Sequence, residues 1–397
     1  MRFVARNFEG LHGRLRRPGR LALAILLPAL LSGCLLDADG DDPRTRFDFT
    51  ALDTLKNPLA RWYHVPGGKS LTAVKFAFRS LDYAQQADSN IAAFSAAVGV
   101  TPTAAGAYVD LRVNPVRLRA LLDAVHARDV VPYVTFDPKE FANPDVAAQY
   151  GYLAQIVQGA WDAKLREVAS VLRDFGHPVL LRWAHEMNGN WYPYSGTFAG
   201  GGRDADGNGV ADGPQAYVAA WRHVHTLFAA EGADKIAWVY SPNAESFPDA
   251  AWNGPYAYYP GSEYVDLIAV DVYEHPEKRR RGLGDLLAPV YNDLGLFWER
   301  TAGDTAYALR PFGLGEYGTA RTGLADRLAW YADAFTTLQD DARVAFHAVY
   351  NAQNGPKDFS LGGGGSGLHG VYSGARFAFA PLEVETESGV TLARLGR

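Results

Sequence analysis

The sequence has a single cysteine, Cys34, in 397 residues. One cysteine cannot form an internal disulfide bond or a cysteine-based zinc or iron–sulfur site. Basic residues are also in the minority, because 38 Lys and Arg stand against 44 Asp and Glu, for a net charge of −6. Nucleic-acid binders present a basic surface, so this balance argues against one. With 48% hydrophobic and 21% charged residues, the composition excludes wholesale disorder and suits a globular protein.

A long hydrophobic run is missing as well. The apolar stretch Leu21–Leu31 is too short to span a membrane as a helix. It follows a segment, residues 1–20, that holds six arginines and only one acidic residue, Glu9. A basic start followed by a short apolar run is typical of a secretory signal peptide.

The apolar run ends in Leu31-Ser32-Gly33-Cys34. This resembles the lipobox of bacterial lipoproteins, in which the thiol is acylated and the chain is cut before the cysteine. An ordinary signal peptide with an incidental cysteine is the alternative, but the only cysteine stands where this chemistry needs one. We therefore expect a signal peptide at 1–33, lipidation of Cys34, and an acidic tether and lead-in at 34–70. The mature chain is expected to be exported and lipid-anchored in the bacterial cell envelope, in the outer membrane if the source has one.

Short β-rich runs alternate with amphipathic segments from about Leu71 onward. The eight predicted strands are Ala73–Phe78, Ala105–Val109, Val130–Phe136, Pro178–Trp183, Lys235–Tyr240, Leu267–Val270, Ala308–Leu314 and Val344–Tyr350. The predicted helices between them include Pro115–Arg128, Trp161–Phe175, Pro214–Glu231 and Thr322–Leu338. In the first of these, apolar residues recur at helical spacing at Val116, Leu118, Leu121, Leu122 and Val125.

Strands and helices that alternate in this way imply parallel strands joined by crossover helices. Eight such units predict an α/β protein, a (β/α)8 TIM barrel that forms a single catalytic domain over residues 71–397. A doubly wound open sheet is the alternative, but no Gly-x-Gly-x-x-Gly pattern follows the first strand. In such a barrel the reacting residues follow the carboxyl ends of the strands.

Two glutamates stand where a barrel places its chemistry. Glu186 follows the fourth predicted strand, beside His185 and near Trp191, and is a candidate general acid. Glu316 follows the seventh predicted strand between glycines, which let a ligand approach the backbone closely. A lone glutamate there would usually be a solvated loop residue, but together with Glu186 it makes a carboxylate pair. Tyr273, after the sixth strand, is either a hydrogen-bond donor to that pair or a packed rim residue.

These residues resemble glycoside hydrolase family 26. The matching positions are Arg182, His185–Gly189, Trp191–Pro193, Tyr217–Val224, Tyr259–Gly261, Val265–Asp266, Asp271–Tyr273 and Gly315–Gly318. The resemblance covers about residues 71–351, and it implies a retaining hydrolase that needs no cofactor.

The resemblance also implies a role for each matched residue. Glu186 would be the acid/base and Glu316 the nucleophile, with carboxyl groups about 5–5.5 Å apart. The residues expected to steady the carboxylates or to contact sugar are Arg182, His185, Asn188, Trp191, Tyr273 and Tyr350. The implied substrate is a polysaccharide with internal β-linkages, first of all β-1,4-mannan.

The end of the third predicted strand departs from the mannanases of this family. It has Thr135–Glu140 where aromatic and histidine residues are common. This end is more similar to relatives that act on mixed-linkage glucan or exopolysaccharide, so β-1,3-1,4-glucanase or exopolysaccharide-trimming activity is the alternative. A non-catalytic carbohydrate-binding lipoprotein is a more distant one, and the presence of both glutamates argues against it. We expect a monomer whose partners are its polysaccharide and, through the lipid anchor, a membrane.

Two charged segments have no place in this mechanism. The loop with Asp204, Asp206, Asn208 and Asp212 has oxygen ligands at alternating positions, like the start of an EF-hand loop, but position twelve is Gln215 instead of Glu. A structural calcium site is one interpretation and a polar glycine-rich loop is the other. The basic run Lys278–Arg281 is typical of a solvated surface.

Overall fold

The computed structural model describes residues 52, 63–64, 71–76, 83–98, 101–275, 277–321, 323–354, 357–359, 383–386 and 389–391. Its contacts divide the chain at residue 41, and all of the described residues belong to the unit that spans residues 42–397. Cys34 and the predicted signal peptide lie outside the described residues. Within the described part of the chain, no helix combines the length and the apolar character needed to span a membrane.

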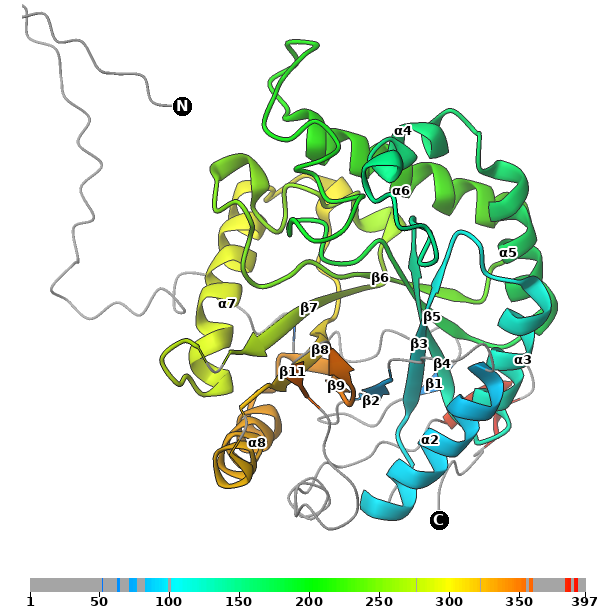
Figure 1. Cartoon of the computed structure of the whole chain (residues 1–397), viewed down its shortest axis with the longest axis vertical. Helices are drawn as coiled ribbons and strands as arrows, with labels where there is room; N and C mark the ends of the chain where they lie inside the picture. The colour runs from blue at the N-terminus through cyan, green and yellow to red at the C-terminus, as the bar shows by residue number, and fades with distance from the viewer. Residues whose placement is uncertain are drawn as a thin grey trace, which may run out of the picture. The chain divides into compact units, whose positions relative to one another are not determined.

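The centre of the fold is a closed barrel of eight parallel strands, which confirms the predicted architecture (Figure 1). In barrel order the strands are β2 (Leu71–Lys75), β3 (Ala104–Asp110), β4 (Val131–Asp137), β5 (Val179–Trp183), β6 (Ile236–Tyr240), β7 (Leu267–Glu274), β8 (Phe312–Thr319) and β9 (Val344–Tyr350). Pairing of β2 with β9, from Leu71 opposite Phe346 to Lys75 opposite Tyr350, closes the barrel.

The helices lie outside the barrel and cover it (Figure 1). They are α2 (Tyr83–Val98), α3 (Pro115–His126), α4 (Tyr152–Val157), α5 (Asp162–Phe175), α6 (Asp212–Ala230), α7 (Leu283–Arg300) and α8 (Leu324–Asp340). Short 3-10 turns are η2 (Ala147–Gln149), η3 (Ala251–Asn253), η4 (Ser262–Tyr264) and η5 (Thr305–Tyr307). After the barrel come β10 (Gln353–Asn354), β11 (Lys357–Asp358), β12 (Glu383–Thr386) and β13 (Gly389–Thr391), and β12 pairs with β1 (Tyr63–His64).

Helix α3 shows how the sequence sets a helix. Asn114 caps it, because its side chain accepts hydrogen bonds from the backbone N–H groups of Val116 and Arg117, and Pro115 fits the first turn. The buried face consists of Leu118, Leu121, Leu122 and Val125. Val116, which was predicted on that face, is 77% exposed, because a residue in the first turn lies beyond the edge of the sheet-facing stripe.

Residues that alternate along the strands fill the barrel. Its lower interior is an apolar cluster of Leu71, Ala73, Ala104, Val131, Tyr133, Leu180, Ala237, Val239, Leu267, Ala269, Phe346 and Ala348. Side chains two residues apart face the same side of a strand. The next inward positions after Ala73, Leu180 and Ala269 are therefore Lys75, Arg182 and Asp271, and all three are fully buried. The upper layer of the barrel interior is thus charged, and it forms the floor of the site.

Two strands differ from their predicted bounds at the site. Strand β7 continues four residues past the predicted end, so Asp271 and Tyr273 lie within the strand. Strand β8 starts at Phe312 and runs to Thr319, so Glu316 also lies within a strand and not after it. One prediction stopped at Asp271 and the other at Gly315 before Glu316, because glycine and a polar side chain that faces the barrel interior have the same sequence pattern as a loop.

Candidate active site

The chain turns sharply directly after β5. Ala184 and Glu186 both adopt left-handed backbone conformations, with φ angles of 48° and 53°. Such angles are strained for residues other than glycine, at a cost of roughly 1 kcal/mol each. Two bonds to neighbouring strands hold the turn: the N–H of Ala184 donates to the carbonyl of Phe136 at 3.0 Å, and that of Glu186 to the carbonyl of Ser241 at 2.7 Å. The turn directs Glu186 over the barrel mouth.

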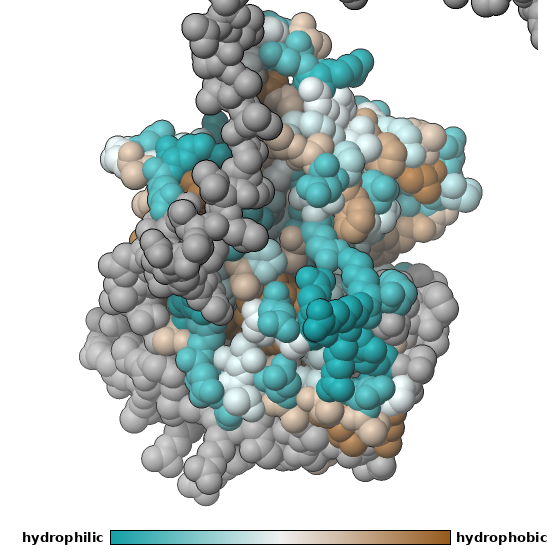
Figure 2. Space-filling model, turned by 90° about the vertical axis from the view of Figure 1, so that its left-hand side faces the viewer, coloured by the Kyte–Doolittle hydropathy of each residue, from teal (hydrophilic) through white to brown (hydrophobic). Residues whose placement is uncertain are grey.

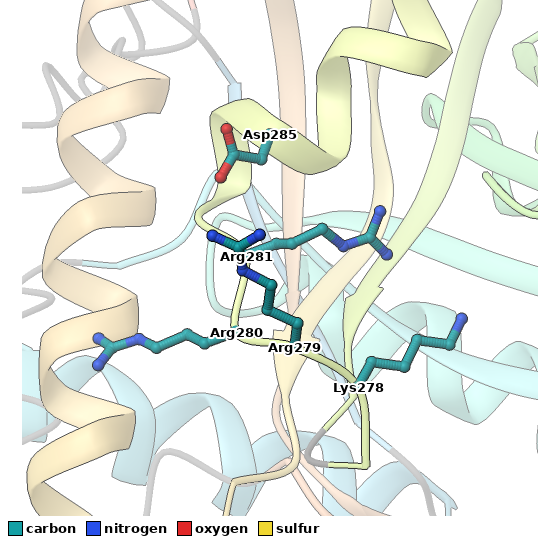
Figure 3. A pocket seen from close by; sticks show the side chains of 5 residues that line it. All are labelled: Lys278, Arg279, Arg280, Arg281 and Asp285. Atoms are coloured by element: carbon teal, nitrogen blue, oxygen red, sulfur yellow. The ribbon is translucent and has the colours of Figure 1, made fainter.

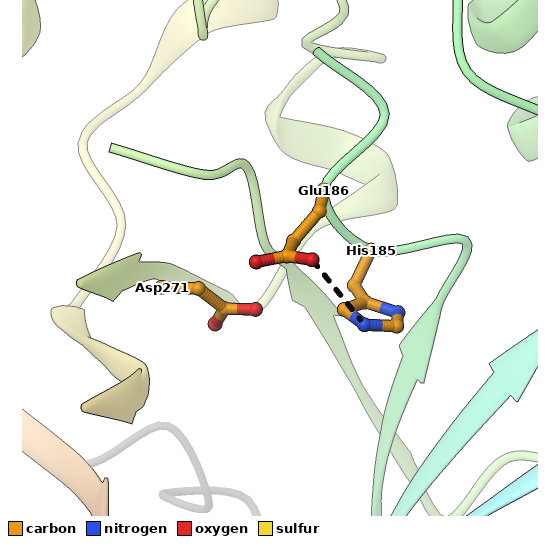
Figure 4. Close-up of side chains that lie close together, drawn as sticks. All are labelled: His185, Glu186 and Asp271. Atoms are coloured by element: carbon orange, nitrogen blue, oxygen red, sulfur yellow. Dashed lines mark ion pairs between the residues drawn. The ribbon is translucent and has the colours of Figure 1, made fainter. Parts of the chain in front are cut away.

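Two donors fix the carboxylate of Glu186. The Asn243 amide donates to Oε1 at 2.7 Å, and the Trp191 indole N–H donates to Oε2 at 2.8 Å. His185 Nε2 lies 3.9 Å from Oε2 (Figure 4). Trp191 can fold back in this way because its neighbour is Gly189, where a Cβ would lie 2.5 Å from the indole ring. Glu186 is only 8% exposed, so these two hydrogen bonds fix a carboxylate that lies close to the surface of the site.

A bulge directs Glu316 into the same site. The pairing of β7 with β8 shifts so that Val270 faces Leu314 and Asp271 faces Glu316, which leaves Gly315 unpaired. Only glycine fits there, because a Cβ on Gly315 would lie 2.5 Å from Asp271 Oδ1. The predicted role of the flanking glycines was ligand approach, and at Gly315 the approaching group is a side chain of the protein itself.

Glu316 is bonded by three donors. Arg182 Nη2 and the Tyr108 hydroxyl both donate to Oε1, and the Tyr273 hydroxyl donates to Oε2 at 2.5 Å. Burial raises the pKa of Glu316, but the positive charge of Arg182 and the other nearby donors outweigh it and lower the pKa to about 2. Glu316 is therefore an ionised carboxylate at neutral pH, in the form that a nucleophile needs.

Arg182 joins Glu316 to a second buried carboxylate, Asp271. Its Nη1 lies 3.0 Å from Oδ1 and 2.9 Å from Oδ2 of Asp271, and its Nε donates to Thr135 Oγ1 at 2.9 Å. Ser241 also donates to Asp271 Oδ1, at 2.9 Å. Burial nevertheless keeps the pKa of Asp271 well above its usual value, so the environment separates the two carboxyl groups that share one guanidinium.

Asp137, at the end of β4, orients the histidine beside Glu186. His185 Nδ1 lies 3.0 Å from Asp137 Oδ1, and the Tyr194 hydroxyl donates to the same oxygen at 3.0 Å. Lys139 Nζ lies 3.2 Å from the other oxygen. Burial raises the pKa of Asp137, but the charges of Lys139 and His185 outweigh it and hold the pKa well below its usual range. His185 therefore has its Nδ1 occupied and directs Nε2 toward Glu186 and the hydroxyl of Tyr192, 3.1 Å away.

The remaining predicted sugar-contacting residues lie at different depths. Trp191 is 41% exposed and lies beside Phe247, with ring centroids 5.6 Å apart, so its ring face is open at the rim. Tyr350 is buried against Tyr273 at the mouth of the barrel. Asn188 is fully buried and exchanges hydrogen bonds with the backbone of Asn243 at 2.8 and 2.9 Å. Its placement therefore supports the loop that carries Asn243 rather than an open sugar-binding surface.

The sequence did not reveal the site roles of several residues, among them Lys75, Tyr108, Asp271 as a partner of Arg182, and Asn243. The period of two along each strand would have found the first three, since they are the inward positions above the apolar barrel layer. Lys75 Nζ donates to the carbonyl of Tyr133 at 3.0 Å, and burial keeps its pKa well below the usual value. Asn243 has no such signal, because a loop after β6 brings it to Glu186.

The predicted calcium ligands form an exposed loop. Asp204 accepts hydrogen bonds from the backbone of Asn208 and Gly209, Asp206 from the backbone of Asn208, and Asp212 from the backbone of Ala205. Asp212 is the first residue of α6, which begins two residues earlier than predicted. These bonds order the loop by themselves, and calcium binding stays a prediction.

The described groups nearest to a metal-ligand set lie in the site itself. His185, Glu186 and Asp271 offer ligand atoms within 4.8 Å of one another (Figure 4). Each oxygen of the two carboxylates already accepts a hydrogen bond from Asn243, Trp191, Arg182 or Ser241. The donor set therefore fits proton transfer and nucleophilic chemistry better than it fits metal coordination.

Comparisons with known proteins point to one family of enzymes. Residues 145–293 match the family model described as glycosyl hydrolase family 26, a range that includes Glu186 and Asp271 but not Glu316. Endoglucanase H of Acetivibrio thermocellus is 24% identical over 246 residues, which are 62% of this chain and 24% of that protein. A mannan endo-1,4-β-mannosidase of Bacillus subtilis is 31% identical over 144 residues, 35% of this chain and 36% of that protein.

Solved structures show the same fold. A family 26 β-mannanase from Bacteroides ovatus superposes with a TM-score of 0.53 at 16% identity, over 85% of this chain and 92% of that one. At an identity this low, the similarity supports a shared barrel fold and no further property. The chain spans about a quarter to a third of the length of the two curated relatives, so their activities describe those proteins.

Proposed function

We propose that this chain, a glycoside hydrolase of family 26, cleaves internal β-linkages of a polysaccharide with retention of anomeric configuration. The observation that carries the proposal is the pair of glutamates on β5 and β8, of which Glu316 is held ionised by Arg182, Tyr108 and Tyr273. A retaining hydrolase needs one ionised nucleophile and one carboxyl group that exchanges a proton. Glu316 is bonded by a guanidinium and two phenol groups, whereas Glu186 is bonded by one amide and one indole N–H.

The mechanism assigns one task to each glutamate. Glu316 attacks the anomeric carbon and forms a glycosyl ester, while Glu186 gives its proton to the leaving oxygen. Glu186 then removes a proton from the water that hydrolyses the ester. Asn243 and Trp191 orient Glu186 in both steps, and Tyr273 returns its hydrogen bond to Glu316 as the charge reappears. A carboxyl separation of about 5–5.5 Å stays a prediction of this mechanism.

β-1,4-Mannan is the substrate that we propose first. The support is the name of the Bacillus subtilis relative, a mannan endo-1,4-β-mannosidase, together with the open ring face of Trp191 beside Glu186. Mixed-linkage β-glucan is the second candidate. It is favoured by Asp137 and Lys139 at the end of β4, where the mannanases carry other residues, and by the longer match to Endoglucanase H.

A reducing-sugar assay on mannan, mixed-linkage β-glucan and β-1,3-xylan tests the proposal. We expect activity on one of them, and we expect Glu316→Ala and Glu186→Ala each to lower the rate by about four orders of magnitude on an unactivated glycan. Glu299→Ala, which removes an exposed carboxylate from the far end of α7, should leave the rate unchanged. Lack of activity on all three glycans would contradict the degradative function, and activity that survives Glu316→Ala would contradict the assignment of the nucleophile.

We further propose that Cys34 is acylated and anchors the chain in the bacterial cell envelope. The support is the sequence alone, with its basic start, short apolar run and single cysteine. Several acyl chains hold a protein on a membrane stably, whereas one does not. Cys34→Ser should release the protein from the membrane fraction, while Ser32→Thr should not. A Cys34→Ser protein that remains with the membranes would contradict the anchor.

The Asp204–Asp212 loop is proposed as a calcium site that stiffens the rim beside α6. Its oxygen groups alternate, and Gly209 at the sixth position has a φ of 84°, as a tight ligand loop requires. Thermal unfolding with calcium and then with a chelator tests it. A melting temperature that calcium raises in the native chain but not in Asp204→Asn would support the site, and equal temperatures in calcium and chelator would contradict it.

A further inference from the structure

Four consecutive basic residues line a pocket on the barrel rim. Lys278, Arg279, Arg280 and Arg281, together with Asp285, surround a cavity of about 500 Å³ (Figure 3). Pockets that bind small ligands have volumes of roughly 300–1,000 Å³, so a sugar unit fits this one. Figure 2 shows the side of the molecule with α7 and α8, where hydrophilic residues gather in one area. The lining is charged throughout, which points to recognition of an anion.

The pocket lies on the catalytic rim. Lys278 stands four residues after the end of β7, the strand whose Tyr273 donates to Glu316. The carboxylate of Glu245 pairs with Lys278 and Arg281 of the basic loop. The backbone N–H of Glu245 donates to Asn243 Oδ1 at 2.9 Å. Asn243 in turn donates to Glu186. The loop is therefore connected to Glu186 through Glu245 and Asn243, and it follows the strand whose Tyr273 bonds Glu316.

The backbone of the basic loop is held on several sides. The Trp330 indole donates to the carbonyl of Arg281 at 3.0 Å, and Arg321 donates to that of Lys278 at 3.4 Å. Lys278 and Arg281 both pair with Glu245, the latter at 3.1 Å. The loop backbone and the side chains of Lys278 and Arg281 are therefore ordered before a ligand arrives, which lowers the entropic cost of binding.

One cation of the pocket is left without a protein partner. Arg280 pairs with Asp326 at 3.7 Å on the side of α8, away from Lys278 and Arg281 (Figure 3). Arg279 makes no hydrogen bond or ion pair within the described part of the chain, and it is exposed. Carboxylates already pair with three of the four cations, Glu245 with Lys278 and Arg281 and Asp326 with Arg280. Arg279 is therefore the cation that can meet a ligand without giving up a protein partner.

We propose that this pocket binds an anionic sugar unit of the glycan that occupies the cleft. The inference rests on the proposed function, because it takes the ligand to be part of the hydrolysed polysaccharide. A guanidinium offers paired N–H donors that match the two oxygens of a carboxylate or sulfate group. A membrane surface fits the site less well, because a cavity of about 500 Å³ encloses a single sugar unit, whereas a lipid surface is flat. The pocket then selects glycans whose neutral β-linked backbone occupies the cleavage site and whose acidic side units lie at a distance from the cleaved bond.

Titration calorimetry with the whole chain at low salt tests the proposal. The probes are hexagalacturonate, a sulfated galactan hexasaccharide, neutral mannohexaose, and vesicles of phosphatidylglycerol. The variants are Arg279→Gln and the double variant Arg279→Gln/Arg280→Gln. The matched control is Arg117→Gln, which removes an exposed charge from α3, far from the loop in sequence and outside the pocket lining.

We expect one of the acidic oligosaccharides to bind more tightly than mannohexaose. The double variant should weaken that binding about tenfold at low salt, and Arg117→Gln should leave it unchanged. Preference for hexagalacturonate would identify a carboxylate ligand, and preference for the sulfated probe a sulfate ligand. Equal binding by all variants, binding only to the vesicles, or no binding to either acidic probe would each overturn the proposal.

The calorimetry separates this proposal from the proposed function. It measures binding and needs no turnover. A chain that hydrolyses no glycan but binds the acidic probe through Arg279 would contradict the hydrolase and support the pocket. A chain that hydrolyses mannan but binds no acidic probe would support the hydrolase and contradict the pocket.

Discussion

Arg182 is the residue on which both the stability and the ionisation of the site depend. It is fully buried, and so is Asp271, which its guanidinium bonds together with Glu316. Replacement by Gln would leave two buried carboxyl groups without their shared positive charge. Removal of one member of a buried ion pair costs about 3–5 kcal/mol. Unfolding entropy grows with chain length, so for a unit of about 350 residues this corresponds to a melting temperature about 4–7 °C lower.

The loss should depend on pH. In the native chain the pKa of Glu316 is lowered to about 2, so its ionised form stabilises the fold above the ordinary carboxyl pKa. That stabilisation is lost as the pH falls from about 4.5 toward about 2. In Arg182→Gln the two buried carboxyl groups lack their positive partner, so they take up protons at a higher pH than in the native chain. Once protonated they are neutral, and the cost of burying an unpaired charge is removed. The difference in the free energy of unfolding should therefore be largest at pH 7 and smaller at pH 4.

Urea unfolding at pH 7 and pH 4 measures both effects. Two further variants each remove only part of the interaction of Arg182 with its neighbours. Arg182→Lys keeps the charge but cannot reach both carboxylates as a planar fork does, so it should lie between the native chain and Arg182→Gln. Thr135→Val removes only the acceptor of Arg182 Nε and should cost about 1 kcal/mol at both pH values. A loss below 1 kcal/mol in Arg182→Gln, or a loss that does not change with pH, would contradict the role assigned to Arg182.

Three further predictions follow from single contacts. Tyr273→Phe removes a hydrogen-bond donor to Glu316, so the pKa of Glu316 should rise and kcat should fall about tenfold. The acid limb of the pH–rate profile should then move to higher pH, and an unmoved limb would contradict this. Asn243→Ala should lower kcat about tenfold in steady-state assays with little change in KM, because Glu186 loses its 2.7 Å donor; a KM effect alone would argue against it. Burial lowers the pKa of His347 to about 3, so the stability it confers above about pH 6.5 is lost toward pH 3. His347→Gln should flatten that part of the stability profile in urea unfolding, and a profile as steep as the native one would refute it.

The barrel could be predicted from the sequence because its signal is local. Each of the eight predicted strands overlaps an observed one, and the amphipathic helices lie between them as expected. The bounds failed where the barrel interior changes from apolar to charged. At Asp271 and Glu316 a polar side chain faces inward, and its energy comes from Arg182, which lies 89 and 134 residues away. The period of two along the strand marks such a position as inward-facing, but it does not tell whether the strand continues or a loop begins there.

The site could be predicted in part for the same reason. Glu186 and Glu316 stand beside short motifs, so their neighbours in sequence already mark them. Tyr108 lacks such a motif, and its contact with Glu316 spans 208 residues and exists only because the barrel closes. The left-handed conformations of Ala184 and Glu186 also depend on bonds to β4 and β6. Three-dimensional closure, and not composition, therefore decides which polar residues complete the site.

The most direct test of the central claim is to trap the intermediate. A 2-deoxy-2-fluoro glycosyl donor slows the hydrolysis of a glycosyl ester, so the ester accumulates on the nucleophile and can be located by mass spectrometry of peptides. We expect the added mass to lie on Glu316 in the native chain, and we expect Glu186→Ala to accumulate the same adduct when the leaving group needs no proton. No adduct, or an adduct on Glu186 or Asp271, would contradict it.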